Sequence, residues 1–207
     1  MKTLFFILII ALSISCANKQ QIKSGDIVFR GALSSSNLSE AINDVTQTAI
    51  STNYTHMGIC DVVNSEVIVY HSDLGKGVIK EPLEVFISSK DTVRYNVDLY
   101  RIKNIESRQI ENAISIAKSL VGSPYNTTYI LEDIGYYCSE YIYELYKTDS
   151  IFQLEPMSFK NSETNTFHKG WIEHYKNLGI AIPEGELGCN PNGMASSNSL
   201  KFIKIIQ

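Results

Sequence analysis

Residues 55–71 read THMGICDVVNSEVIVYH. β-Branched and other strand-forming residues dominate on both sides of Asn64 and Ser65, a polar pair typical of a tight turn. The pattern predicts a β-hairpin with strands at 55–63 and 66–71. Strands joined in this way pair antiparallel, so the segment favours an α+β fold over a parallel sheet with helical crossovers.

The rest of the chain supplies further strands and helices in mixed order. Hydrophobic residues recur at helical spacing in three segments, and a loop-like region rich in proline and glycine follows residue 153. We predict strands at 26–30, 78–80, 92–102 and 200–206, and helices at 37–49, 106–120, 138–146 and 171–178. Together they predict an antiparallel sheet packed against helices.

Length and composition indicate one globular domain, which we place at 24–207. The chain has 207 residues, of which 44% are hydrophobic and 19% charged. A domain of this size buries a core large enough to fold without disulfides or a structural metal. The net charge of −4 and the lack of a lysine or arginine cluster argue against a nucleic-acid partner.

The first sixteen residues have the features of an export signal. Lys2 precedes an apolar run from Leu4 to Leu12, which is too short for a permanent membrane helix, and Cys16 follows. We predict a signal peptide at 1–16 with a lipoprotein cysteine, Cys16, at its end, and a polar tether at 17–23. The protein is then exported and touches the membrane only through its lipid. An ordinary signal peptide cut nearby is the alternative.

Three cysteines remain after Cys16, namely Cys60, Cys138 and Cys189. Export favours disulfides, so a Cys60–Cys189 bridge is possible, and one thiol is left over. No cysteine has the spacing of a zinc site. We expect no metal and no cofactor.

Cys138 begins the predicted helix 138–146. The positive end of a helix dipole lowers the pKa of a thiol, and free backbone N–H groups there can hold an oxyanion. These properties suit a nucleophile. A buried structural cysteine is the alternative reading of the same position.

Two histidines stand where a base is needed. His56 and His71 lie near the open end of the predicted hairpin, where they could be neighbours across strands. Gly58 faces the same side as His56 and leaves room for another chain or a ligand. A base oriented by a second polar group is the logic of a catalytic triad. A metal site at the two histidines lacks an evident third ligand, and His168 and His174 are read as structural.

Four motifs together resemble one family. They are SGDIVF at 24–29, THMGI at 55–59, GSPYN at 122–126 and YCSE at 137–140. They are similar to those of the YiiX-like family, which comprises circularly permuted relatives of the NlpC-type papain-like cysteine peptidases and amidases. In that family the histidine precedes the cysteine, as here. The resemblance implies a permuted papain-like fold, with an antiparallel sheet or small open barrel packed against helices.

The resemblance also implies roles for individual residues. Cys138 corresponds to the nucleophile, His56 to the base and His71 to the orienting residue, with Asp73 as the fallback for that third role. Asn126 stands where the family often has aspartate. Candidates for contact with the substrate or the oxyanion are Tyr125, Tyr137 and Ser139.

The expected function is therefore that of an exported, lipid-anchored cysteine hydrolase. It would cleave amide bonds, of cell-wall peptides or related amides, through an acyl-enzyme. The substrate would be a small peptide, amide or acyl compound. Two alternatives stay open: an acyltransferase or lipid ester or amide hydrolase on the same fold, and a catalytically silent ligand-binding module.

Overall fold

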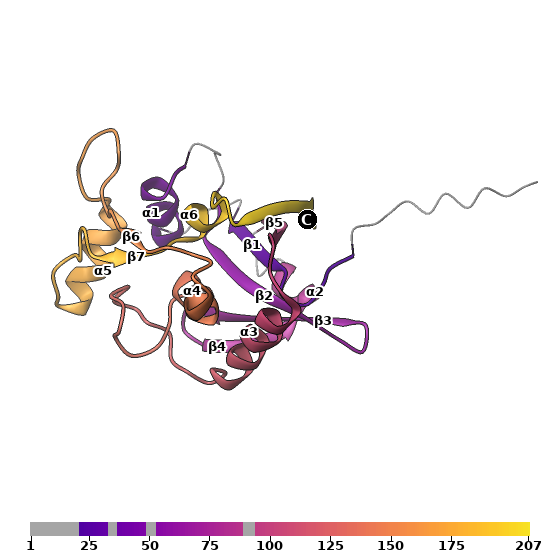
Figure 1. The fold of residues 1–207 in the computed structure, drawn as a ribbon. Coiled ribbons are helices and arrows are strands. Elements are labelled where there is room, and N and C mark those ends of the chain that lie inside the picture. The colour runs from indigo at the N-terminus through magenta and orange to yellow at the C-terminus, as the bar shows by residue number, and fades with distance from the viewer. Residues whose placement is uncertain (1–20, 33–36, 49–52, 89–93) are drawn as a thin grey trace, which may run out of the picture.

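The computed structural model describes residues 21–32, 37–48, 53–88 and 94–207, so the predicted signal peptide lies outside the described residues. Six strands form one antiparallel sheet in the order β4-β3-β2-β1-β5-β8 (Figure 1). Their bounds are β1 Ile27–Ala32, β2 His56–Val63, β3 Glu66–Asp73, β4 Gly77–Pro82, β5 Tyr95–Ile102 and β8 Leu200–Ile205. The α+β prediction is confirmed.

The hairpin at 55–71 forms as predicted. Asn64 and Ser65 adopt φ values of 50° and 71°, which suit a two-residue turn whose twist matches that of the strands. Ladder pairs run from Val63↔Glu66 to Ile59↔Tyr70. The turn thus fixes the register that places the histidine-bearing ends of β2 and β3 at the same edge.

Helices α3 (Ser107–Ser119) and α4 (Cys138–Tyr146) cover one face of the sheet (Figure 1). The larger core lies here, where Phe29, Met57 and Ile59 meet Tyr141 and Leu145. On the other face a smaller core contains Val28, Cys60 and Phe86, the last from the short helix α2 (Leu83–Ile87). Alternation along β2 therefore sends neighbouring residues into two different cores.

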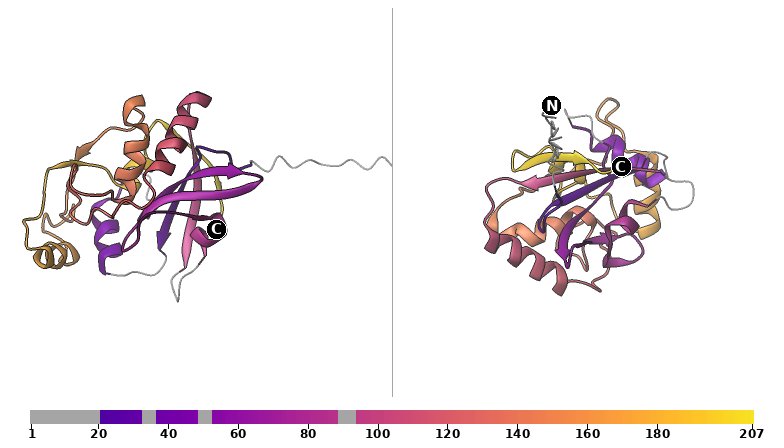
Figure 2. Two further views of the ribbon diagram at one scale, coloured as in Figure 1. Left: turned by 90° about the horizontal axis from the view of Figure 1, so that it is seen from below. Right: turned by 90° about the vertical axis from the view of Figure 1, so that its right-hand side faces the viewer.

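The chain after β5, together with α1 from between β1 and β2, adds a group of short elements at one end of the sheet (Figures 1 and 2). In this group α1 packs against α5. The group comprises α1 Asn37–Val45, η1 Lys147–Asp149, β6 Glu155–Pro156, α5 Lys169–Leu178, β7 Leu187–Gly188 and α6 Pro191–Ala195. Through α6 it also contacts α4, so it stands beside the helix end that carries Cys138.

The structure decides between the two forms that the sequence left open, a sheet or a small open barrel, and adds elements that were not predicted. The sheet is open, with β4 and β8 at its edges, and is not a barrel. The elements α2, α6 and the β6–β7 pair were not predicted, because each is at most five residues long and shows no usable periodicity. Only α6 had a readable signal: Asn190 accepts a hydrogen bond from the Gly193 N–H as N-cap, and proline follows at the first helical position.

The possible Cys60–Cys189 disulfide is absent. Both residues are free, buried thiols. Cys60 lies in the smaller core and Cys189 in the larger one, so the sheet separates them. Among the described residues, no helix is both long and apolar enough to cross a membrane.

Strands β2 and β3 approach each other closely at Gly58. A Cβ at this position would lie 2.6 Å from Val69 Cγ1, 3.0 Å from the Tyr70 carbonyl oxygen and 3.1 Å from His71 Cβ. The predicted room for another chain is thus filled by the strand that carries His71. We expect Gly58→Ala to lower the free energy of unfolding by about 2 kcal/mol, because the overpacked strands must separate. Denaturant unfolding measures this.

Gly193→Ala is the matched control for that substitution, since its Cβ comes no closer than 3.3 Å to Asn190. It should leave stability nearly unchanged. If Gly58→Ala were as stable as the wild type, the close approach of the two strands would not constrain the fold.

Candidate active site

Cys138 sits where the pairing of β2 and β3 ends. Beyond the Ile59↔Tyr70 pair, the segment before α4 contacts both strands. The Ser72 hydroxyl of β3 donates a hydrogen bond to the Tyr136 carbonyl oxygen, and the Met57 N–H of β2 acts on the Cys138 thiol by lowering its pKa. The residue next to His56 in the chain therefore interacts with the thiol.

A buried carboxylate fixes the start of α4. Glu140 Oε2 accepts hydrogen bonds from the Tyr137 N–H at 3.0 Å and from Asn126 Nδ2 at 3.1 Å. Asn126 also donates to the Ile130 carbonyl oxygen, so it ties the preceding loop to the helix. Burial raises the pKa of Glu140 to about 7. These contacts hold the turn that presents Cys138.

Burial dominates the electrostatics of the Cys138 thiol. The residue is 6% exposed, and desolvation raises its pKa to about 12. Hydrogen bonds from the N–H groups of Ser139, Met57 and Cys138 itself lower the pKa, as does the positive charge of Arg30, but they offset only part of the rise. The expectation of a lowered pKa at the helix end is therefore wrong for the resting site, because desolvation outweighs the helix end.

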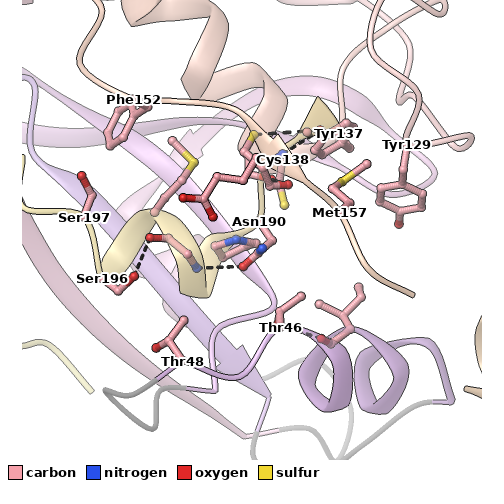
Figure 3. A pocket seen from close by; sticks show the side chains of 18 of the residues that line it. Thr46, Thr48, Tyr129, Tyr137, Cys138, Phe152, Met157, Asn190, Ser196 and Ser197 are labelled. Atoms are coloured by element: carbon pink, nitrogen blue, oxygen red, sulfur yellow. Dashed lines mark hydrogen bonds between the residues drawn. The ribbon is translucent and has the colours of Figure 1, made fainter. Parts of the chain in front are cut away.

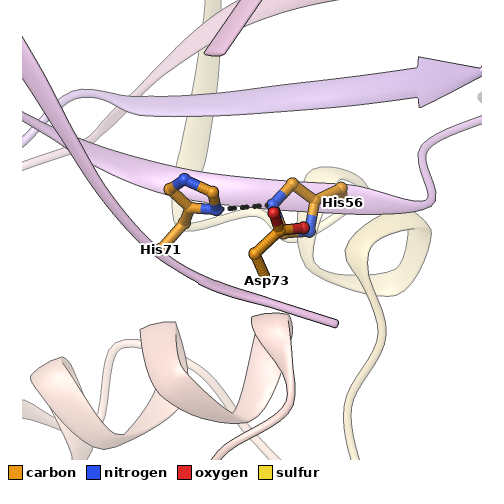
Figure 4. Close-up of side chains that lie close together, drawn as sticks. All are labelled: His56, His71 and Asp73. Atoms are coloured by element: carbon orange, nitrogen blue, oxygen red, sulfur yellow. Dashed lines mark hydrogen bonds between the residues drawn. The ribbon is translucent and has the colours of Figure 1, made fainter. Parts of the chain in front are cut away.

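The two histidines of the hairpin form a buried relay. His56 Nε2 and His71 Nδ1 are 2.8 Å apart, a hydrogen-bond distance (Figure 4). On its other side, His71 Nε2 lies 3.2 Å from Glu81 Oε1. His71 is fully buried and His56 is 9% exposed. The order His56–His71–Glu81 thus runs from β2 across β3 to β4.

The carboxylate at the end of this relay favours one arrangement of its protons. A carboxylate oxygen 3.2 Å from Nε2 of His71 favours a proton on that nitrogen, and Nδ1 of His71 then accepts from Nε2–H of His56. The lone pair of His56 is then on Nδ1. That is the tautomer a general base requires.

The aromatic ring of Phe86, in α2, packs against both imidazoles of the relay. Its ring stacks on His56 with centroids 5.6 Å apart and meets the His71 ring edge-on at 5.1 Å. Arg30 holds α2 in place by donating to the Phe86 carbonyl oxygen at 2.7 Å. The two imidazoles are therefore fixed by apolar contacts as well as by polar ones.

Asp73 comes near the relay but is paired elsewhere. It lies 2.9 Å from Lys76 Nζ. Burial raises the pKa of Asp73, but the Lys76 hydrogen bond and the positive charges around it outweigh burial and leave the pKa lowered. His71, not Asp73, is the residue hydrogen-bonded to His56 Nε2.

A third possible metal ligand does exist, contrary to the sequence-based expectation. One donor atom each of His56, His71 and Asp73 lies within 4.8 Å of the others (Figure 4). Two imidazoles and a carboxylate suit zinc chemically. In this arrangement, however, the two imidazoles share a proton and Asp73 is paired with Lys76. The two histidines fit a hydrogen-bonded relay, and we derive no reaction step through a metal.

The remaining candidates, Tyr125, Tyr137 and Ser139, line a cavity of about 720 Å³ together with Cys138 (Figure 3). The Ser139 hydroxyl donates to the Cys189 carbonyl oxygen, and the Tyr137 hydroxyl accepts from the Cys189 N–H, so both hydroxyls hold the cavity wall. Burial raises the pKa of Tyr125 well above its usual value and keeps its hydroxyl neutral.

The other two histidines have structural roles. His168 accepts a hydrogen bond from the Gly170 N–H at the start of α5, and His174 Nε2 contacts the Thr127 carbonyl oxygen at 2.7 Å. Neither belongs to the relay.

Sequence reasoning missed Glu81 and Phe86. Glu81 had a usable signal: when β4 pairs with β3, Glu81 lies opposite Val69 and diagonal to His71 on one face. The strand expected at 78–80 was too short to include it. Phe86 had no signal, because a five-residue helix after Pro82 shows no period.

Comparison with known proteins gives the same family throughout. A family model described as "Permuted papain-like amidase enzyme, YaeF/YiiX, C92 family" matches residues 21–204. The uncharacterized protein YiiX of Escherichia coli (strain K12) is 30% identical over 144 residues, which are 68% of this chain and 66% of that protein. The match thus spans just under two thirds of that relative's length.

A solved structure shows the same fold. The crystal structure of metalloprotein yiiX from Escherichia coli O157:H7 superposes with a TM-score of 0.70 at 22% sequence identity, over 88% of this chain and 96% of that chain. The matched family model, the order of histidine before cysteine and the shared fold agree. This chain belongs to the permuted papain-like amidase family that includes YaeF and YiiX.

Proposed function

We propose that this protein is a thiol-dependent amidase in which Cys138 attacks the substrate carbonyl and His56 moves the proton. One observation carries the proposal. The thiol lies among backbone N–H groups at a helix start, and the strand residue that supplies one of them, Met57, follows His56 of a buried imidazole relay that ends in a carboxylate. A binding module has no use for a relay of this kind, whereas acyl transfer needs both parts.

The reaction then proceeds in two halves. His56 Nδ1 takes the thiol proton as the sulfur–carbon bond forms, and N–H groups now facing the sulfur stabilise the oxyanion. His56 returns the proton to the leaving nitrogen, the carbon–nitrogen bond breaks, and a thioester remains on Cys138. Water, deprotonated by His56, attacks that thioester, and the carbon–sulfur bond breaks to release the acid. His56 then returns the proton to the Cys138 sulfur, which restores the thiol. An alcohol or amine in place of this water would make the protein an acyltransferase.

His71 and Glu81 act as positioning residues in this proposal. They hold the His56 tautomer and stabilise the imidazolium that forms during attack. Because His71 is fully buried, its contact with Glu81 is not screened by solvent.

We also propose that the protein is an exported lipoprotein. The support is the sequence alone: Cys16 directly follows a short apolar run, with a polar tether before the folded residues. The lipid would localise the enzyme at the cell envelope without a membrane-spanning helix.

Substitutions in the relay should reduce amidase activity in a graded order. We expect Cys138→Ala and His56→Gln each to lower kcat/KM by at least about 1,000-fold. Glu81→Gln should lower kcat/KM by about tenfold, because the substitution weakens the preference for one His56 tautomer but leaves the base in place. Loss of the Glu81 charge should also move the acidic limb of the pH profile to lower pH, since the imidazoles become less basic.

Glu84→Gln is the matched control, because Glu84 is exposed on α2 near the same strand. It should behave as the wild type. Substantial activity in Cys138→Ala would rule out the thiol mechanism. An unchanged pH profile in Glu81→Gln would show that Glu81 has no part in that mechanism.

The raised pKa predicts how the thiol reacts. Below a pKa of about 12 the resting Cys138 is a neutral thiol, and its thiolate fraction grows as pH rises. Alkylation by iodoacetamide, followed by peptide mass spectrometry, should therefore accelerate about tenfold per pH unit between pH 7 and pH 9. A rate already level at pH 7 would instead show a thiolate–imidazolium pair formed in advance.

The anchor is tested on the full chain expressed in a bacterium. Mass spectrometry should find a mature N-terminus at Cys16 carrying a diacylglyceryl thioether, and the protein should enter the detergent phase on phase partitioning. Cys16→Ala should lose both properties. A wild-type N-terminus at any other residue would contradict the lipoprotein assignment.

A further inference from the structure

Arg30 is a buried cation on the strand next to His56. In the ladder between β1 and β2, Arg30 pairs directly with His56. The side chain is 7% exposed, and an arginine side chain keeps its positive charge inside a protein. Its guanidinium donates to the Phe86 carbonyl oxygen at 2.7 Å and lies 4.6 Å from the Phe86 ring centre and 4.5 Å from that of Tyr95. These contacts hold the charge in one place.

No carboxylate neutralises this charge at close range. Among the residues that the structure describes, Arg30 forms no ion pair. The two rings stabilise the cation only in part, so its burial is costly. A link to a carbonyl oxygen needs a donor but not a charge. The charge does act on the site, since Arg30 is one of the groups that oppose the rise which burial causes in the pKa of Cys138.

Arg30 begins a row of four side chains on one face of the sheet. The row continues with His56 of β2, His71 of β3 and Glu81 of β4, one from each successive strand. His56 Nε2 is 2.8 Å from His71 Nδ1, and His71 Nε2 is 3.2 Å from Glu81 Oε1. The Phe86 ring packs against the first three members. Two imidazoles therefore lie between a fixed cation and a carboxylate.

The two ends of this row act on a proton in opposite directions. Glu81 attracts the proton that the relay gains when His56 accepts it from the thiol, and Arg30 repels that proton. The positive end of the row stands beside His56, which must hold a free lone pair before the attack. The cation therefore favours the proton-accepting form of His56 and opposes its protonation by solvent.

The other titratable groups around the relay are paired or uncharged. Asp73, at the end of β3, lies near both imidazoles but pairs with Lys76 at 2.9 Å. Cys138 at the start of α4 is a neutral thiol at rest, because burial raises its pKa to about 12. Burial also raises the pKa of Tyr125, which faces Cys138 and Asp73, well above its usual value. The two ends of the row therefore dominate the field at the relay.

Building on the proposed amidase function, we infer that Arg30 is a positioning residue whose charge keeps His56 unprotonated to lower pH than the relay alone would allow. It acts through His56, since it does not line the cavity beside Cys138. The charges of Arg30 and Glu81 then move the acidic limb of the pH profile in opposite directions. Arg30 becomes the fourth member of the relay, at the end opposite the carboxylate.

Removing the charge should raise the pH at which the base becomes protonated. We expect Arg30→Met to move the midpoint of the acidic limb of kcat/KM upward by about one pH unit. Below both midpoints kcat/KM should then fall about tenfold, and above them it should change little. Arg30→Lys, which keeps the charge, should stay within about 0.3 pH unit of the wild type.

Arg108→Met is the matched control, because it removes an arginine charge from an exposed position on α3. Solvent screens that charge, so the pH profile should not change. Arg30→Gln is a second neutral variant that keeps a donor for the Phe86 carbonyl oxygen. It gives the same test of charge if Arg30→Met does not fold.

The double variant tests the opposite signs directly. Arg30→Met should move the acidic limb to higher pH and Glu81→Gln to lower pH, so the limb of the double variant should lie between those of the single variants. A limb that stays in place or moves to lower pH in Arg30→Met would overturn the inference. Equal shifts in Arg30→Met and Arg30→Lys would do the same, because charge would then not be the cause.

A titration without turnover separates this inference from the amidase proposal. In the Cys138→Ala protein, the carbon-bound ring protons of His56 are followed by NMR against pH, and the spectrum of His56→Gln identifies their signals. Adding Arg30→Met should raise the midpoint by about one pH unit. An unchanged midpoint would reject the role of Arg30. The expected rise, together with no amide cleavage by the wild type, would reject only the amidase proposal.

Discussion

The site depends on the contact between the N-terminal end of α4 and strand β2. The Met57 N–H lowers the pKa of the Cys138 thiol, and Ser72 of β3 holds the residue two positions before the cysteine. These contacts lie just beyond the ladder pair Ile59↔Tyr70, where the pairing of β2 and β3 ends. The strands that receive the start of the helix are the same strands that carry His56 and His71. The helix start that carries the thiol is therefore placed by the two strands that carry the imidazoles.

Burial gives this arrangement its chemical character. Desolvation disfavours the thiolate at Cys138 and raises its pKa, while the surrounding N–H groups favour negative charge. The same groups become useful when charge passes from sulfur to the carbonyl oxygen. A resting thiol needs a base at the moment of attack. The His56–His71–Glu81 order supplies a base whose tautomer is fixed, which explains why the relay is buried along with the nucleophile.

Much of this followed from local sequence rules. The Asn64–Ser65 turn fixed the hairpin, and strand parity placed His56 and His71 at its open end. Parity also assigns Cys60 to the face opposite Met57, a consequence that the disulfide expectation did not use.

The features that the sequence analysis missed depend on contacts between residues far apart in the chain. Glu81 reaches His71 through pairing between β3 and β4, and Phe86 does so from a helix too short to show a period. The raised pKa of Cys138 comes from burial under the chain after β5, which no local pattern encodes. The cavity has the same origin, because its walls come from residues more than 140 positions apart.

The most direct test of the account is to capture the acyl-enzyme. Wild-type protein is mixed with an excess of a fluorogenic acyl amide, quenched in acid within the first turnover, and analysed by intact and peptide mass spectrometry. The account predicts an acyl adduct on Cys138, absent from Cys138→Ala and strongly reduced in His56→Gln. Turnover of the amide with no adduct on any thiol, or an adduct on Cys189 instead, would contradict it.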